Sequence, residues 1–125
     1  MSEHSEQAAL VAWARMSEGI YPELRWLYSS LNGIPIPAPD KIRFAIMNRM
    51  KSEGMKKGVS DLCLPVALGG YHGMYIEMKK DHRSEIKQEQ VEFLDFLAEQ
   101  GYLGIRCNGF EHARNELVAY LSLPK

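Results

Sequence analysis

The sequence predicts an α/β fold, because segments with the helical spacing of apolar residues alternate with short apolar runs typical of strands. In chain order these segments read α-β-α-β-β-α-β-α. The length of 125 residues suits one domain, and we expect a single domain over residues 1–125. A composition of 46% hydrophobic and 25% charged residues is typical of a soluble globular protein with a buried core.

Four helices are predicted from hydrophobic periodicity and from capping residues. The first runs from Glu3 to Ser17 and follows a serine that can cap it, and the second runs from Asp40 to about Glu53. The third covers residues 86–100 and the fourth covers residues 110–121. The apolar residues of the second helix form one stripe, which we expect to be packed: Ile42, Phe44, Ala45, Ile46 and Met50.

The predicted strands are short and lie between turn-forming residues. Residues 24–30 form the first strand, and the proline-rich stretch 31–39 that follows is a rigid loop. Two apolar runs at 62–67 and 73–78 are joined by a glycine-containing connection that suits a hairpin. Residues 102–107 form the last strand.

Several classes of protein are disfavoured by the composition. No apolar stretch approaches the roughly 20 residues that span a membrane, and the acidic, polar start is unlike a signal peptide. Cys63 and Cys107 each stand alone, which favours two buried thiols in a reducing compartment over a disulfide or zinc site. We therefore expect a cytoplasmic protein with no membrane partner.

Basic residues gather in two stretches, although the formal net charge of −1 argues weakly against nucleic acid. One stretch lies between residues 41 and 57, and the other begins at residue 79. The phosphates of a nucleic acid would lie along these stretches. For any one lysine, an equally good alternative is that it simply lies on a solvated basic surface. The candidates for contact with nucleic acid are Lys56, Lys57, Ser60, Lys80 and Arg83.

The strongest chemical signal is Glu77-Met78-Lys79 at the end of an apolar strand, with Asp61 heading the preceding strand. Glu77 and Lys79 share one strand face because side chains alternate along a strand. Mg²⁺ takes hard oxygen ligands and keeps several waters, so Asp61, Glu77 and the Met78 main-chain carbonyl suffice as ligands. Lys79 can orient a water or stabilise transition-state charge, which is the chemistry of a metal-dependent phosphodiesterase.

Glu6 and Gln90 are polar residues on the apolar faces of their predicted helices. Glu6 serves either as an acid that favours its own helix dipole or as a third acid in the site. Gln90 needs a hydrogen-bond partner, which is either the backbone or a catalytic water or phosphate. The spacing leaves both pairs of readings open, and it also leaves open a purely structural ion pair between Lys79 and one of the acids.

Four pieces of the sequence occur in one order along nearly the whole chain: Glu6-Gln7-Ala8-Ala9, Gly58-Val59-Ser60-Asp61-Leu62, Tyr75-Ile76-Glu77-Met78-Lys79 and Gln90-Val91-Glu92-Phe93-Leu94. Together they resemble the VRR-NUC domain of the PD-(D/E)xK nuclease superfamily, known from the Fanconi anaemia-associated nuclease and from small stand-alone phage and bacterial proteins. The resemblance implies a restriction-endonuclease-like core with helices flanking a mixed central sheet, and cleavage of DNA that depends on Mg²⁺ or Mn²⁺. It implies that Asp61 and Glu77 bind metal, that Lys79 is catalytic, and that Glu6 and Gln90 complete the site.

Stand-alone members of this family are similar to Holliday junction resolvases, which act as homodimers on branched DNA. The resemblance therefore implies a homodimeric endonuclease selective for branched or four-way DNA, in a bacterial or phage-infected host cell. The candidate dimer surfaces are the loop 31–39 and the last helix, at Leu117, Tyr120 and Leu121. The alternatives are a catalytically silent nucleic-acid-binding module on the same fold, and a restriction-like or tRNA-directed nuclease.

Overall fold

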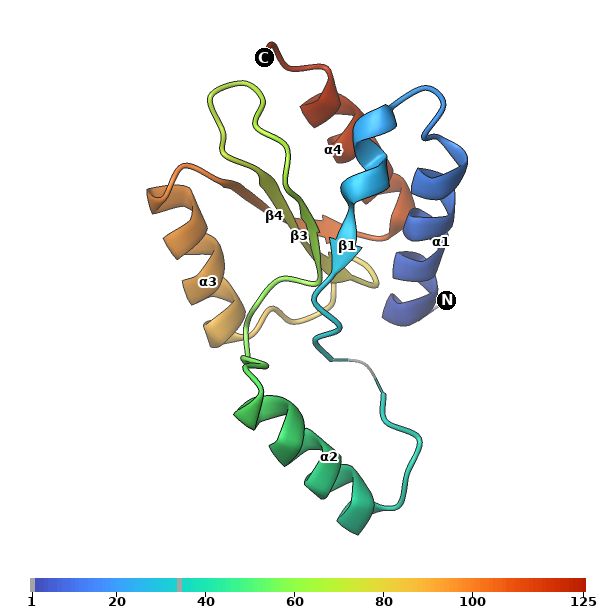
Figure 1. Ribbon diagram of the computed structural model, residues 1–125, viewed down its shortest axis with the longest axis vertical. Helices are drawn as coiled ribbons and strands as arrows, with labels where there is room; N and C mark the ends of the chain where they lie inside the picture. The colour runs from blue at the N-terminus through green and yellow to red at the C-terminus, as the bar shows by residue number, and fades with distance from the viewer. Residues whose placement is uncertain (1, 34) are drawn as a thin grey trace.

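A four-stranded mixed sheet lies at the centre of the computed structural model, which describes residues 2–33 and 35–125 (Figure 1). The first three strands pair antiparallel in sheet order, and the fourth pairs parallel with the third. The sheet confirms the predicted α/β fold with a mixed central sheet. The strands are β1 (Tyr28–Ser29), β2 (Leu62–Leu64), β3 (Met74–Lys79) and β4 (Leu103–Asn108).

Helices lie on both sides of this sheet. In Figure 1, α1 and α4 lie together on one side, and α3, which makes the crossover between the parallel strands β3 and β4, lies on the other. A short 3₁₀ helix, η1, precedes β1 and begins at a proline, which confines the first strand to two residues. The helices are α1 (Glu3–Met16), η1 (Pro22–Trp26), α2 (Asp40–Ser52), α3 (Gln88–Glu99) and α4 (Phe110–Leu121).

The main core lies between the sheet and the helices α1 and α4. Side chains of β3 alternate, so Met74, Ile76 and Met78 point into this core, while Tyr75 stacks against Phe93 of α3 on the other side. Glu77 and Lys79 follow the same alternation as Tyr75 and therefore face α3. The two faces of one strand thus separate the core from the polar groups.

The last helix cannot supply the dimer surface that the sequence suggested. Leu117 and Tyr120 are 0% and 1% exposed because they pack in the core, and Leu121 is partly buried against it. The Tyr120 hydroxyl also donates a hydrogen bond to the Val66 carbonyl, which fixes α4 to the loop after β2. These apolar positions hold the fold together.

The second helix has nearly the predicted boundaries, but the expectation that its stripe is packed is wrong. No residue of α2 is buried, and Ile42, Phe44 and Ile46 are 53%, 65% and 37% exposed. Two extended connections carry α2 away from the sheet, and Figure 1 shows it projecting below the rest of the structure. We call residues 32–59 the arm; Ile34 of the arm, like Met1, lies outside the described residues. Across the described ranges, no helix is long and apolar enough to cross a bilayer.

Candidate active site

Asp61 and Glu77 face each other across the antiparallel strands β2 and β3. Leu62 pairs with Ile76, so the next step along the ladder sets Asp61 opposite Glu77. The Ser30 N–H donates to the Asp61 carbonyl at 2.9 Å, so pairing with the β1 side continues at this residue. Side chains directly opposite one another share one face, with Cβ atoms about 5 Å apart. Strand register alone therefore brings two carboxylates together.

Lys79 joins this pair on the same face of β3, two residues beyond Glu77. All three charged side chains are buried: Glu77 is 1% exposed, Lys79 5% and Asp61 8%. Charged groups this deeply buried require partners, because an isolated buried charge is strongly unfavourable. The partners come from the strand itself and from the beginning of α3.

Gln90 connects the lysine to the glutamate. Its Oε1 accepts hydrogen bonds from Lys79 Nζ at 3.0 Å and from the Lys87 N–H at 2.9 Å. Its Nε2 donates to Glu77 Oε2 at 3.1 Å. Gln90 lies in the first turn of α3, so the helix terminus positions both charged groups of β3 at once. The hydrogen-bond partners expected for Gln90 are therefore both this charged pair and the backbone N–H of Lys87.

Asp61 is held by the backbone of β3. Its Oδ2 accepts a hydrogen bond of 2.7 Å from the Met78 N–H. In a strand, the N–H and C=O of one residue point to the same neighbour, so the Met78 carbonyl also points to the Asp61 side. Two carboxylates and one main-chain carbonyl thus share a location.

The electrostatics of the site are those of two carboxylates held close together away from water. Burial, and then the adjacent Asp61 carboxylate, raise the pKa of Glu77 to about 9. Burial also raises the pKa of Asp61, against the neighbouring Glu77 carboxyl group, the hydrogen bond from the Met78 N–H and the charge of Lys79. A cation between the carboxylates would reverse both shifts, because opposite charge favours the ionised form.

The donor set fits a hard divalent cation. Glu77 Oε1 is buried and has no hydrogen-bond partner among the described residues, so one strong oxygen acceptor is left free in the site. Mg²⁺ is bound through one or two carboxylates and keeps several waters. Within residues 2–33 and 35–125, no group of three or more His, Cys, Asp or Glu side chains could hold a metal ion. A cation would therefore be held by Asp61, Glu77, the Met78 carbonyl and water.

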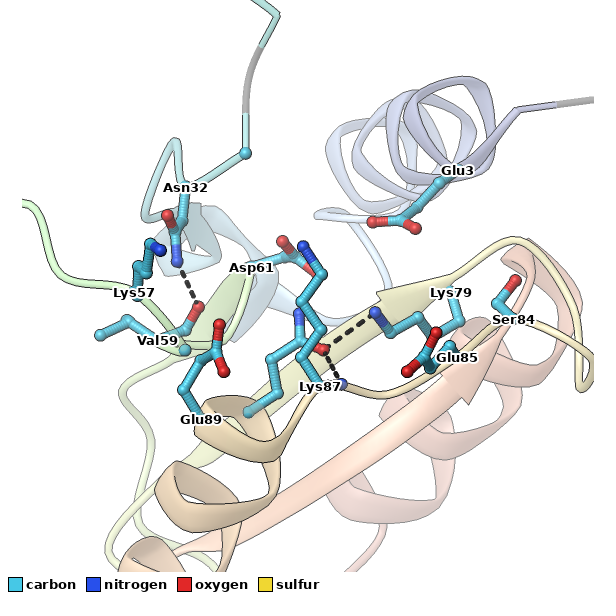
Figure 2. Close-up of a pocket in the computed structure, with 13 residues that line it drawn as sticks. Glu3, Asn32, Lys57, Val59, Asp61, Lys79, Ser84, Glu85, Lys87 and Glu89 are labelled. Atoms are coloured by element: carbon cyan, nitrogen blue, oxygen red, sulfur yellow. Dashed lines mark hydrogen bonds between the residues drawn. The ribbon is translucent and has the colours of Figure 1, made fainter. Parts of the chain in front are cut away.

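The pocket in front of these residues has a volume of about 500 Å³ (Figure 2). Its walls come from separate parts of the chain: the first turn of α1, the two ends of the arm, and the beginning of α3. Asp61, Lys79 and Gln90 line its floor, and Glu3 projects toward it from α1. Burial raises the pKa of Glu3, and Lys79 opposes the shift.

Glu6 lies elsewhere. Its Oε1 accepts a hydrogen bond of 3.1 Å from the Phe110 N–H, the first helical residue of α4. The residue before it, Gly109, has no side chain to cap the helix, so Glu6 supplies the acceptor from α1. A Cβ on Gly109 would lie 3.0 Å from this oxygen and would crowd the cap. Glu6 does not line the pocket, and Glu3, one helical turn earlier, does.

Comparison with known proteins identifies the family of the chain. The model of the VRR-NUC domain family matches residues 1–111 of the chain. The chain belongs to the VRR-NUC family. A solved structure described as a VRR_NUC domain protein is 25% identical, with a TM-score of 0.76; the match covers 100% of this chain and 92% of that one. No curated protein matches the sequence. Membership of the VRR-NUC family implies a nuclease that binds DNA and requires a divalent metal ion.

The residues of this VRR-NUC domain that were predicted to contact nucleic acid lie in different environments. Lys57 lines the pocket, and Lys56 and Lys80 are exposed near it along the chain. Arg83 is exposed and pairs with Asp81 at 3.2 Å. Ser60 is 2% exposed, and its hydroxyl has no hydrogen-bond partner among the described residues. Ser60 is therefore covered by protein, which corrects its place among the contact residues.

Three polar residues in or near the VRR-NUC pocket were not among the predicted site residues, although Lys87 belongs to the second basic stretch of the sequence. Asn32 Nδ2 donates to the Lys56 and Val59 carbonyls at 3.2 and 2.9 Å, which fastens the two ends of the arm together. Lys87 precedes the first residue of α3 and lines the pocket. Arg106 pairs with Glu77 in the β3–β4 register, and its guanidinium donates to the Asp81 and Ser84 carbonyls at 3.1 and 2.6 Å. Such contacts join segments far apart in sequence, so spacing along the chain carries no trace of them.

Proposed function

We propose that this VRR-NUC protein is a divalent-metal-dependent DNA endonuclease. The observation that carries the proposal is the buried group of Asp61, Glu77, Lys79 and Gln90, in which one Glu77 oxygen is left without a partner. A buried carboxylate oxygen without a hydrogen-bond partner lowers the stability of the fold, and a cation bound to it would remove that penalty. Perturbed acids beside a lysine in a pocket are typical of a catalytic site.

The proposed roles follow from the positions of the side chains. Asp61, Glu77 and the Met78 carbonyl would hold Mg²⁺ or Mn²⁺. When bound, such an ion lowers the pKa of a water and neutralises phosphate charge. Lys79 projects its ammonium into the pocket, where it orients the attacking water or stabilises charge on the phosphate. Gln90 positions Lys79, because its Oε1 restrains the ammonium and its Nε2 simultaneously restrains Glu77.

In this proposal, Glu3 takes the place that the family resemblance implied for Glu6. It is the acid of α1 that lines the pocket, and its pKa responds to both Lys79 and Asp61. We assign Glu3 as an acceptor for water at the edge of the site. Glu6 is assigned the structural role of capping α4.

The finer proposal is that the substrate is branched DNA, including four-way junctions, and that the enzyme is a homodimer in the cytoplasm of a bacterial or phage-infected cell. Two sites are needed to cut two strands of a junction, and a two-fold dimer is the commonest way to provide them. The exposed apolar face of α2 supports a dimer, since isolated helices of this length are marginal in water without a partner. The free, buried Cys63 and Cys107 agree with a reducing compartment.

We propose that the second copy covers α2 by antiparallel pairing of the two helices. Antiparallel pairing sets the first turn of one copy beside the last turn of the other, so the dipoles of the two helices oppose each other. Ile42 and Ile46 lie one turn apart and would form the apolar seam.

The proposed function is tested by a cleavage panel of linear, flapped, forked and four-way DNA, each with Mg²⁺ and with Mn²⁺. We expect metal-dependent cutting that is strongest on the branched substrates. Binding without nicking on any substrate in either metal would support the silent binding module instead. Cutting that is confined to RNA or to one linear sequence would support the restriction-like or tRNA-directed alternatives.

A further inference from the structure

Helix α3 begins with a residue that is poorly suited to its position. Lys87 is the N-cap, with extended backbone at φ −81° and ψ 155°, and its side chain makes no capping hydrogen bond. A lysine has three donors and no acceptor, so it cannot satisfy the free N–H groups of the first helical turn. Its positive charge also opposes the helix dipole at this end. Serine, threonine, aspartate and asparagine are the residues that stabilise such a position.

The same protein shows what a complete cap looks like. At the start of α1, the Ser5 N–H donates to Ser2 Oγ at 3.0 Å, and the Ser2 N–H donates to Ser5 Oγ at 2.9 Å. Helix α3 has only the second half of this arrangement, in which the Lys87 N–H donates to Gln90 Oε1. A serine at position 87 would supply the missing half. Lysine at this position therefore makes the helix less stable than serine would.

The Lys87 side chain extends into the pocket of the site. Lys87 lines the pocket together with Lys57, which comes from the end of the arm on the other wall (Figure 2). Among the described residues, no acid lies within 4 Å of the Lys87 ammonium to form an ion pair. The third lysine of the lining, Lys79, is buried and already bonded to Gln90. Lys57 and Lys87 are the exposed lysines of this lining.

We infer that Lys87 is a substrate-positioning residue that binds a backbone phosphate of the DNA strand being cut. This inference rests on the proposed nuclease function. Violations of local sequence preference are expected where a residue serves a site and not the fold. Lys87 directly precedes the first turn of α3, and Gln90 in that turn hydrogen-bonds Lys79 of β3. A phosphate bound to Lys87 would therefore lie next to the phosphate on which Lys79 is proposed to act. The competing role is charge balance toward Glu85 and Glu89, which also line the pocket. Neither acid lies within ion-pairing distance of the ammonium.

The test uses two measurements on Lys87→Ser. The first is the thermal midpoint of the otherwise wild-type protein. Completing the capping box should raise it by roughly 2–4 °C. The second is binding of a fluorescein-labelled four-way junction in Mg²⁺ over a series of salt concentrations, with Lys79→Ala as a shared background that prevents cutting. Loss of one phosphate contact should lower the slope of log Kd against log[salt] by about 0.7–0.9 and weaken binding several-fold.

Matched variants keep the result interpretable. Lys87→Arg should retain the slope because it keeps the charge, and Lys125→Ser makes the same chemical change at the exposed C-terminus and should alter neither measurement. An unchanged slope in Lys87→Ser would overturn the inference and leave a solvated lysine. A thermal midpoint of Lys87→Ser that is equal to or below that of the wild type would refute the claim that Lys87 destabilises α3. Failure of the proposed function would appear separately, as wild-type protein that cuts no DNA in Mg²⁺ or Mn²⁺.

Discussion

Gln90 Oε1 accepts a hydrogen bond from the Lys79 ammonium at 3.0 Å, and its amide nitrogen donates to Glu77, so one side chain sets the distance between an acid and a base. Gln90 belongs to α3 and the other two belong to β3, so the contact also joins a helix to the strand that it covers. The charged groups of β3 are therefore held in position only when α3 is packed on the sheet.

Lys79→Ala should abolish most Mg²⁺-dependent cutting while the fold and much of the DNA binding remain. The ammonium is the group proposed to act on the phosphate, and loss of such a group lowers turnover by on the order of 10²–10³-fold. Single-turnover cleavage measures the effect. Lys80→Ala, which removes the adjacent exposed lysine, should retain the chemical step. Full activity in Lys79→Ala would refute its assigned role.

Gln90→Ala should lower activity less than Lys79→Ala does, by about 10- to 100-fold, because it releases both Lys79 and Glu77 without removing either. The pH–rate profile should also shift, since the amide contacts a titrating acid. Gln88→Ala, in the same turn of α3 but with an exposed side chain, is the matched control. A stability loss with an unchanged pH profile would assign Gln90 to the helix alone.

The metal-free protein should lose stability as pH rises. The folded-state pKa of Glu77 is about 9, well above the ordinary value of 4.5, so the folded state retains a proton that the unfolded state releases. The stabilisation is fully present below pH about 4.5 and is lost as pH rises toward 9. Thermal melts in EDTA between pH 5 and 9 measure this trend. Glu77→Gln should flatten it, Glu92→Gln on an exposed position should not, and a flat wild-type profile would contradict the shift.

Glu3→Gln and Glu6→Gln should separate function from stability. Glu3→Gln should weaken metal-dependent cutting with little change in the free energy of unfolding, because Glu3 is exposed at the pocket. Glu6→Gln should retain cutting but lose about 0.5–2 kcal/mol, because a charged cap on α4 is weakened. Denaturant unfolding and cleavage assays on both proteins decide this. Exchange of the two phenotypes would restore the assignment that the sequence favoured.

Ile46→Glu should convert a dimer into a monomer in light scattering, because it places a charge in the proposed apolar seam of Ile42 and Ile46 on α2. Asn48→Glu adds the same charge on the opposite, exposed side of the helix and should leave the dimer intact. A wild-type monomer at assay concentrations would refute this mode of assembly.

Much of the fold and of the site could be predicted because both depend on short-range pattern. Alternation along a strand places Glu77 and Lys79 on one face, and helical periodicity places Gln90 on the buried side of α3. Which acid of α1 lines the pocket was harder to predict, because Glu3 and Glu6 lie on the same side of the helix. Only the tertiary structure shows that it is Glu3. Ser60 looked available in a basic loop, but the folded chain buries it next to Asp61.

The packing of α2 could not be predicted for a different reason. An amphipathic stripe shows that a helix has an apolar face, but it does not show what covers that face. In α1 and α4 the covering surface is the sheet, whereas in α2 it is absent from the described chain. The prediction of one packed stripe was wrong on two points: Phe44 lies on the side of α2 opposite Ile42 and Ile46, and no residue of the helix is buried.

The position of the arm has a consequence for how assembly bears on cutting. Asn32 ties the outgoing chain to the returning chain at Lys56 and Val59, and these same segments form one wall of the pocket. Gly58 fits this wall tightly against α3, where a Cβ would clash with the Glu89 carbonyl oxygen. A molecule bound to α2 would therefore be connected to the pocket through these two segments, and we expect assembly and cutting to depend on each other.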